Sequence, residues 1–388
     1  MIICQGNFFS LRGNFFPKEV LILKIKTLLC GVIDIWHKRC ISKKIVGSLL
    51  LTASLLTSAA CSLQNRSTPP LEEGNVPRIQ PITFASGSVN GLWVSIAAAI
   101  AEKSNQYFQG YPITATTGGA IANPYLLQNG QAAIGLSQGF LLEKAQAGLA
   151  PYEGVLDSIQ GIASLETTVL YLITDKQSPA GTLEDLMANG GKARLGVLPR
   201  TDSSYLILQY VLAGCGLNDA GDLQEPGTDI YFAEGGSLFK AYNDLYFDLL
   251  VINKALPDAA LSELLSKRES VLLSLKPDTI RSLTEKHGWS PVTIPAGTYP
   301  GQEEDVLTIG IKTLLIVHQD LPEEVAYYLT KSVYENKAFY EIIHDSYKKV
   351  NVNDFPNDLV VPLHPGARRY YEEIGLLAKS AGDEEDAL

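Results

Sequence analysis

Three short apolar segments between residues 82 and 138 constrain the fold most, because each is followed by glycine or small polar residues. The segments and the residues after them are 82–85 with 86–91, 113–116 with 117–120, and 132–136 with Ser137 and Gln138. Apolar residues at intervals of three and four predict a helix at 92–107, between the first two segments. Strands that alternate with helices indicate an α/β fold, in which ligands bind beyond the carboxyl ends of the parallel strands. We therefore expect the three strand ends to face one ligand.

A second lobe and two connecting strands are predicted farther along the chain. About 310 residues follow residue 80, which is more than one hydrophobic core usually supports. The extended apolar segments 162–174 and 307–318 would each cross between two lobes and form a hinge. The expected divisions are lobe 1 at 81–174, lobe 2 at 175–306, and a return strand with C-terminal helices that pack on lobe 1 at 307–388. Further predicted elements are strands at 193–198, 230–232 and 247–252, and helices at 123–128, 203–213, 322–337 and 366–378.

The first 60 residues carry the pattern of a lipoprotein signal peptide. Four basic residues between 38 and 44 precede an apolar run that is short for a membrane-spanning helix and ends in small residues before Cys61. We expect cleavage before Cys61 and attachment of lipid to its thiol, with an uncleaved anchor helix of the same topology as the alternative. Residues 1–36 look like neither a targeting signal nor a domain, so we expect translation to start nearer Trp36.

The segment after the leader and the charge of the chain narrow the range of partners. Residues 61–80 contain three prolines and no hydrophobic periodicity, which predicts a tether to the membrane. The formal net charge is −11, and it becomes −17 without the leader, which holds 8 of the basic and 2 of the acidic residues. A surplus of negative charge argues against nucleic acid as a partner, because phosphate contacts need clustered Lys and Arg. Cys215 is the only cysteine after Cys61, so we expect no intramolecular disulfide.

Five short motifs occur in order along the chain, and together they resemble a known family. They are the glycine-rich turn at 86–91, Thr116-Thr117-Gly118-Gly119, Gly-Thr-Leu-Glu-Asp-Leu at 181–186, Gly-Thr-Tyr-Pro-Gly at 297–301, and His364-Pro365-Gly366-Ala367. The chain resembles the TAXI-type substrate-binding proteins of TRAP (tripartite ATP-independent periplasmic) transporters from residue 80 to about residue 376.

The resemblance implies a two-lobed periplasmic-binding-protein fold, of the type II-like or Venus-flytrap kind. It implies that a small organic acid or amino acid, such as glutamate or a 2-oxo acid, is captured by lobe closure outside the cytoplasmic membrane. The ligand would then pass to the membrane permease of a TRAP transporter. The alternatives are a binding protein for an ABC importer or for a sensor kinase.

Two loops depart from the family pattern, and one of them is 253–257, where Asn-Lys-Ala-Leu-Pro replaces a more glycine-rich turn. Residues 199–204 read Pro-Arg-Thr-Asp-Ser-Ser where these proteins usually have Gly-Ser-Gly-Thr, which leaves the ligand identity open. In one interpretation Arg200 binds a ligand carboxylate through two hydrogen bonds, and in the other it is a solvated arginine paired with Asp202. Asp202 would either contact the ligand or cap the helix that begins at Ser203, and we favour the cap.

The candidate ligand-binding residues lie at the predicted strand ends and in the loops opposite them. They are Ser88, Asn90, Thr117, Gly118, Gly119, Ser137, Gln138, Arg200, Thr201, Ser203 and Tyr299. For each of them ordinary turn chemistry is the alternative, because Gly, Ser, Thr and Asn populate tight turns without any ligand. Glu166 would either meet an amine on the ligand or face solvent from the middle of its strand.

A catalytic function is the alternative from a different class. Gly135-Leu136-Ser137-Gln138-Gly139 matches the G-x-S-x-G pattern of a nucleophile elbow, which would make Ser137 the nucleophile of a hydrolase. Only two predicted strands precede Ser137, whereas an α/β-hydrolase places the elbow after several strands and an oxyanion loop. The sequence also lacks a P-loop, an H-E-x-x-H motif and a C-x-x-C pair. We therefore expect no enzyme activity, no cofactor and no metal.

Overall fold

A computed structural model describes residues 81–89, 91–107, 112–188, 194–215 and 230–379. These residues all belong to one compact unit. The predicted leader, the lipidation site Cys61, the tether and the candidate residue Asn90 lie outside the described residues. None of the helices in the described part of the chain is long and apolar enough to cross a membrane.

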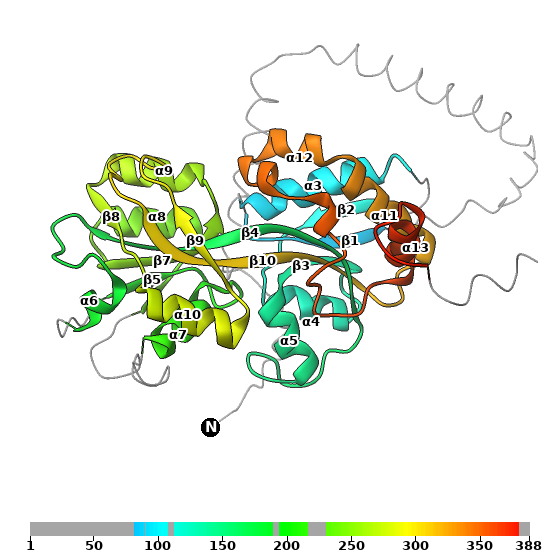
Figure 1. Ribbon diagram of the computed structural model, residues 1–388, viewed down its shortest axis with the longest axis horizontal. Coiled ribbons are helices and arrows are strands. Elements are labelled where there is room, and N and C mark those ends of the chain that lie inside the picture. The colour runs from blue at the N-terminus through cyan, green and yellow to red at the C-terminus, as the bar shows by residue number, and fades with distance from the viewer. Residues whose placement is uncertain (1–80, 90, 108–111, 189–193, 216–229, 380–388) are drawn as a thin grey trace, which may run out of the picture. The chain divides into compact units, whose positions relative to one another are not determined.

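One hydrogen-bonded sheet runs through both lobes. The strands are β1 (Ile82–Ala85), β2 (Ile113–Thr116), β3 (Ile134–Gln138), β4 (Ile159–Asp175), β5 (Leu195–Val197), β6 (Ile230–Phe232), β7 (Leu249–Ala255), β8 (Ser270–Leu272), β9 (Ser290–Ile294) and β10 (Val306–His318). The main path has the order β2-β1-β3-β10-β4-β7-β5-β6, with β8 paired to β4 and β9 paired to β10. The two long strands β4 and β10 lie side by side and pass from one lobe to the other (Figure 1). This arrangement confirms the predicted α/β fold of two lobes with two hinge strands.

Helices cover both faces of the sheet in each lobe. They are α3 (Leu92–Ser104), α4 (Ala122–Gln128), α5 (Gly139–Ala147), α6 (Leu183–Ala188), α7 (Ser204–Gly214), α8 (Gly235–Asn243), α9 (Ala259–Lys267), α10 (Pro277–His287), α11 (Glu323–Glu335), α12 (Lys337–Ile343) and α13 (Pro365–Glu373). Two short 3-10 helices are η2 (Asp345–Lys349) and η3 (Val352–Asp354).

Lobe 1 holds β1, β2 and β3 between two helical layers. The cluster that contains Phe84 and Ile100 joins the sheet to α3, α11 and α13, and a separate cluster that contains Leu127 and Leu142 joins it to α4 and α5. The C-terminal segment is tied to the hinge, since the Tyr371 hydroxyl donates to the Ile162 carbonyl at 2.9 Å. The layers separate in Figure 1, where α3, α11 and α12 lie on one side of the hinge strands and α4 and α5 on the other.

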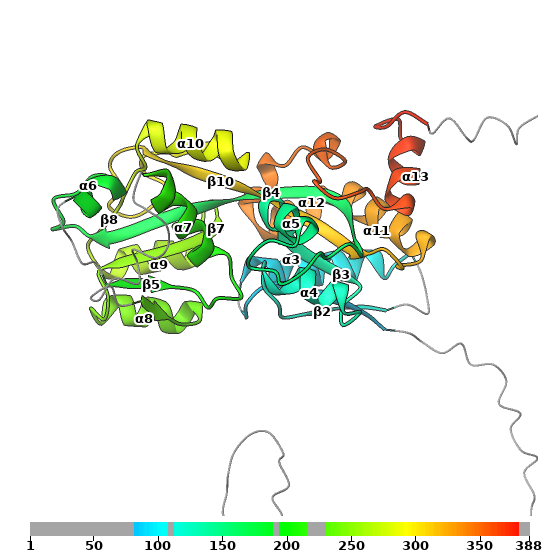
Figure 2. The ribbon, with the colours of Figure 1, turned by 90° about the horizontal axis from the view of Figure 1, so that it is seen from below.

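The side chains of β7 point alternately to the two faces of the sheet and contribute to both cores of lobe 2. Leu249 and Val251 belong to the cluster under α7 and α10, whereas Leu250 and Ile252 belong to the cluster under α8 and α9. Side chains on a strand point to opposite faces in turn, so one apolar strand can serve both layers. In Figure 1, α8 and α9 lie on one side of this sheet and α7 and α10 on the other, and Figure 2 views the same lobe from below.

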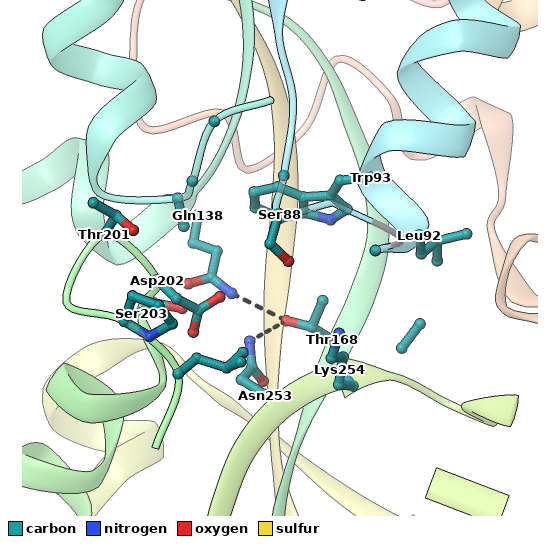
Figure 3. Close-up of a pocket in the computed structure, with 18 of the residues that line it drawn as sticks. Ser88, Leu92, Trp93, Gln138, Thr168, Thr201, Asp202, Ser203, Asn253 and Lys254 are labelled. Carbon is teal, nitrogen blue, oxygen red and sulfur yellow. Dashed lines mark hydrogen bonds between the residues drawn. The ribbon is translucent and has the colours of Figure 1, made fainter. Parts of the chain in front are cut away.

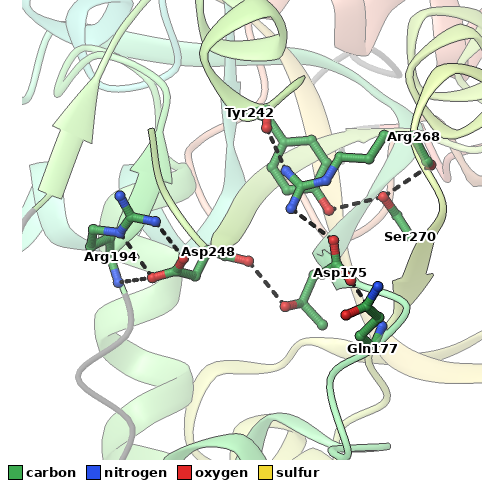
Figure 4. Close-up of polar contacts among 8 residues, drawn as sticks. Asp175, Gln177, Arg194, Tyr242, Asp248, Arg268 and Ser270 are labelled. Carbon is green, nitrogen blue, oxygen red and sulfur yellow. Dashed lines mark hydrogen bonds and ion pairs between the residues drawn. The ribbon is translucent and has the colours of Figure 1, made fainter. Parts of the chain in front are cut away.

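Polar contacts fix the end of β4 that is farthest from lobe 1 (Figure 4). The Arg268 guanidinium lies over the Tyr242 ring, 4.1 Å from its centroid, and donates to Asp175 at 3.0 Å. The Tyr242 hydroxyl donates to the Ser270 hydroxyl at 2.9 Å. The backbone N–H of Gln177 and then Arg268 hold the pKa of Asp175 below its ordinary value. An ion pair, a cation–π contact and hydrogen bonds thus anchor β4 in lobe 2.

β3 extends farther at its carboxyl end than the sequence predicted. The prediction ended this strand at residue 136, but Ser137 and Gln138 continue it. They pair with Leu314 and Thr313 of the antiparallel β10, and this partner extends the strand past the local sequence signal.

Candidate ligand-binding site

A cavity of about 80 Å³ lies between the two lobes. It is lined by the turn after β1 with the start of α3, the loop after β2, the end of β3, the middle of β4, the loops after β5 and β6, and the end of β7. One enclosed water molecule needs roughly 10–15 Å³ on this measure, so the space suits a small solute.

The lobe 1 rim of the cavity is braced by one buried amide. Nδ2 of Asn123 donates to the carbonyl oxygens of Ser86 and Leu136, each at 2.7 Å, and Oδ1 accepts the backbone N–H of Gly119 at 3.0 Å. The ends of β1 and β3 and the loop after β2 are thereby joined. A Cβ atom at Gly118 would lie 2.1 Å from Oδ1 of Asn123, so only glycine fits at this position. The helix predicted at 123–128 begins one residue earlier, at Ala122, so Asn123 lies inside its first turn and braces the strand ends.

The two lobes touch directly at one side of the cavity. The backbone N–H of Ile121 donates to the carbonyl oxygen of Thr201 at 3.2 Å. A Cβ atom at Gly119 would lie 2.5 Å from the same oxygen. The glycine therefore permits the close approach of the lobe 2 loop, and the structure represents a closed arrangement of the cleft.

Thr168 on the hinge strand β4 connects cavity residues of both lobes. Its hydroxyl accepts hydrogen bonds from Nε2 of Gln138 in lobe 1 at 3.1 Å and from Nδ2 of Asn253 in lobe 2 at 2.8 Å (Figure 3). The hydroxyl donates its own proton to the Ile311 carbonyl of β10 at 3.1 Å. A carbonyl can only accept, so both lone pairs of Thr168 are left to accept from the two amides. This arrangement fixes which end of each amide faces Thr168.

Three carboxylates, Glu166, Asp202 and Glu234, and the ammonium group of Lys254 line the cavity. Glu166 is 1% exposed, and its oxygens accept from the Trp93 indole N–H at 3.0 Å and the Tyr347 hydroxyl at 2.7 Å. The charge of Glu166 and burial raise the pKa of Tyr347 well above its ordinary value, with burial the larger cause. Burial also raises the pKa of Asp202, an effect that the hydrogen bonds from Ser204 and then the charge of Lys254 oppose.

Six of the predicted residues line the cavity: Ser88, Gly118, Gly119, Gln138, Thr201 and Ser203. Asp202 both lines the cavity and holds the start of α7, since its Oδ1 accepts the backbone N–H of Ser204 at 2.8 Å. The two interpretations of Asp202 are therefore compatible.

Two of the predicted lobe 1 residues are not brought to the cavity. Thr117 is exposed outside the lining. Ser137 is fully buried, and its hydroxyl donates to the Ala120 carbonyl at 2.8 Å. A serine nucleophile needs a base that takes up its proton, and here the proton is held by a backbone carbonyl. The geometry at Ser137 thus gives no support to the hydrolase alternative.

Arg200 and Tyr299 also lie outside the cavity lining. The Arg200 guanidinium stacks on the rings of Tyr205 and Phe232, 4.7 Å from each centroid, and forms no ion pair with Asp202 among the described residues. Tyr299 is 3% exposed, and its hydroxyl lies 2.8 Å from that of Tyr171 within the lobe 2 core. Arg200 is exposed, as the solvated interpretation predicted, but its observed partners are two aromatic rings and not Asp202, and its contact with a ligand carboxylate stays a prediction.

Lining residues outside the predicted candidates include Trp93, Thr168, Glu234, Asn253 and Lys254. The turn before α3 could have indicated Trp93, because the first turn of a helix after a glycine-rich loop faces the same ligand space. Thr168 lies inside an apolar strand and carries no local signal. Asn253 and Lys254 were expected in a turn after residue 252, but they continue β7.

No group of three or more His, Cys, Asp or Glu side chains that could hold a metal ion occurs in the described ranges. What the cavity offers instead is backbone, hydroxyl, amide and charged groups that face one another across two lobes, which suits reversible binding of a polar solute.

Comparisons with known proteins concern most of the chain. A model of the NMT1-like family matches residues 84–375. A solved structure of the periplasmic binding protein BugD is 15% identical with a TM-score of 0.48, over 76% of this chain and 98% of that chain. MatC from Rhodopseudomonas palustris with bound malate is 15% identical with a TM-score of 0.47, over 76% of this chain and 96% of that chain. The substrate-binding protein of an amino acid ABC transporter is 11% identical with a TM-score of 0.40, over 70% of this chain and 100% of that chain.

Proposed function

This chain belongs to the NMT1-like family, and we propose that it is an extracytoplasmic solute-binding protein of a TRAP-type secondary transporter of the TAXI kind. It captures a small organic acid or an amino acid, with glutamate-like and 2-oxo-acid-like solutes as the expected class. It is a lipoprotein that Cys61 anchors to the membrane, and it delivers its solute to the membrane permease of the transporter.

The observation that carries the proposal is the position of Thr168. This residue belongs to a strand that passes between the lobes, and it holds one cavity side chain of each lobe, Gln138 and Asn253. A solute that touches both side chains gains contacts that exist only when the lobes are closed. Such a solute shifts the population toward the closed form by its differential affinity for the two forms.

Solute binding is tested by thermal unfolding of the purified protein with dicarboxylates, 2-oxo acids, amino acids and sugars. Ligand at about 100 times its dissociation constant adds about 2.7 kcal/mol to the free energy of unfolding, which raises the midpoint by several degrees. We expect a shift with one carboxylate-bearing class. Silence across the panel, with protein refolded to remove any bound solute, would contradict the proposal.

The kind of transporter is tested by solute uptake in membrane vesicles that contain the permease. An imposed ion gradient should drive uptake that depends on this protein, without ATP. Uptake that needs ATP would favour the ABC importer, and binding without any uptake would favour the sensor kinase. The hydrolase alternative predicts esterase activity that Ser137→Ala abolishes, whereas the proposed function predicts none in either protein.

A further inference from the structure

Two amide oxygens in the cavity have no hydrogen-bond donor. Oε1 of Gln138 and Oδ1 of Asn253 are buried and accept no hydrogen bond within the described part of the chain. Gln138 is 1% exposed and Asn253 is 8% exposed. Because Thr168 binds the NH₂ group of each amide, neither amide can turn its oxygen toward Thr168 to find a partner. Both residues line the space between the lobes, and each of the two buried oxygens needs a donor that the described part of the chain does not supply.

The charged residues that line the cavity also favour a ligand that donates hydrogen bonds. Among the described residues that line it, Lys254 is the single cation, against Glu166, Asp202 and Glu234. Glu166 is buried, and its two hydrogen-bond donors, Trp93 and Tyr347, are neutral. A buried carboxylate without a cation is costly, and a positively charged group on the ligand removes that cost.

We propose that this cavity selects solutes that carry a protonated amine, so that an amino acid binds and the 2-oxo acid of the same carbon skeleton does not. The inference rests on the proposed function and narrows its class of solutes. An ammonium group has three donors and no acceptor, which complements amide oxygens and carboxylates. A 2-oxo group offers only an acceptor and would set its oxygen against the amide oxygens. Lys254 and the cavity hydroxyls remain as donors for a carboxylate on the same solute.

The test compares solutes that differ only in this group. Calorimetric titration of the purified full-length protein in mild detergent would use glutamate with 2-oxoglutarate, alanine with pyruvate, leucine with 4-methyl-2-oxopentanoate, and cadaverine as an amine without carboxylate. We expect at least one amino acid to bind about 100-fold more tightly than its 2-oxo partner. A 2-oxo acid that binds as tightly as its amino acid would overturn the inference and leave the proposed function standing. Binding of cadaverine alone would support the amine preference and contradict the carboxylate class, and no binding by any compound would overturn both.

Variants assign the preference to the cavity groups. Gln138→Met removes the amide oxygen at similar length, and the preference for the amino acid should fall at least 10-fold. Gln160→Met is the matched control, because Oε1 of Gln160 on β4 is also buried without a partner but lies outside the cavity lining. Glu166→Gln is a second variant that removes the charge and keeps an acceptor for Trp93. If both cavity variants keep the wild-type preference, or if Gln160→Met lowers it equally, the inference is wrong.

Discussion

The two rims of the cavity are built in different ways. Lobe 1 offers backbone at Gly118 and Gly119, held in place by the buried Asn123. Lobe 2 offers mainly side chains from the loop after β5 and the end of β7. A braced backbone makes a stiff platform, whereas side chains on a loop can adjust to a solute. We therefore expect substitutions of the braced lobe 1 backbone, at Gly119 or at Asn123, to cost mainly stability or closure, and substitutions of side chains that line the cavity to change mainly binding.

The largest effect is expected for Asn123→Ala. The substitution leaves the carbonyls of Ser86 and Leu136 and the N–H of Gly119 without their partner, which should cost about 3 kcal/mol of unfolding free energy. Asn253→Ala in lobe 2 breaks one hydrogen bond to Thr168 and should cost about 1 kcal/mol. Urea unfolding measures both losses of free energy, provided that the dependence of the unfolding free energy on urea concentration is the same in each variant as in the wild type. Equal losses of unfolding free energy in the two variants would contradict the proposed difference between the rims.

Gly119→Ala should weaken ligand binding with little effect on the unliganded protein. The new methyl group would meet the Thr201 carbonyl at 2.5 Å and hold the lobes apart, which should lower affinity about 100-fold. The unfolding midpoint without ligand should change by less than about two degrees, since the clash disappears when the cleft opens. Gly154→Ala is the control, because a Cβ atom there meets no atom within 4 Å. Wild-type affinity in Gly119→Ala would show that closure does not need this contact.

Asp202→Asn should raise stability at neutral pH. Burial raises the pKa of this carboxyl in the folded state, so the stability it contributes at low pH is lost as the pH rises from about 3.8 through the folded-state pKa. The variant escapes that loss, so its advantage over the wild type should grow as the pH rises from 4 to 8, measured by urea unfolding at each pH. Asp175→Asn is the control of opposite sign, because contacts lower the pKa of Asp175. A gain that does not change with pH would show that desolvation is not the cause.

The smallest effect is expected for Arg200→Leu. Loss of the stacking on Tyr205 and Phe232 should cost roughly 0.5–1 kcal/mol of stability. Ligand affinity should stay within about twofold of the wild type, because Arg200 lies outside the cavity lining. A tenfold loss of affinity for a carboxylate solute would restore the interpretation in which Arg200 binds the ligand.

The contrast between the rims also explains which parts of the site could be predicted from the sequence. β1 and β2 have the predicted bounds, and the glycine and hydroxyl residues beside them form much of the lobe 1 rim. Glycine-rich turns after apolar strands are local signals, so no knowledge of distant neighbours was needed. Thr168 and Asn253 are ordinary strand residues, and only the pairing of β4 with β7 and β10 brings them to the cavity.

The least predictable part of the fold is the stretch that holds β8, α10 and β9. β8 has three residues, and β9 is a largely exposed edge strand that begins with Ser290-Pro291. α10 begins at Pro277 and contains mostly polar residues, with Ile280 and Leu283 as its buried apolar contacts. Edge strands and polar helices bury too little to leave a periodic pattern, so their places depend on the lobe that they cover.

The pair of long strands also determines what kind of motion the molecule can make. A single linker would let one lobe rotate in any direction relative to the other. Two neighbouring strands joined by backbone hydrogen bonds define one axis, so essentially one rotation of the lobes remains. Register shifts between Lys312 and Leu314 and between Leu315 and Ile316 concentrate the twist within this ladder. The lobes can then open and close by twisting of the paired strands, without loss of the hydrogen bonds between them. Because this motion follows one axis, every closure brings the same surfaces together.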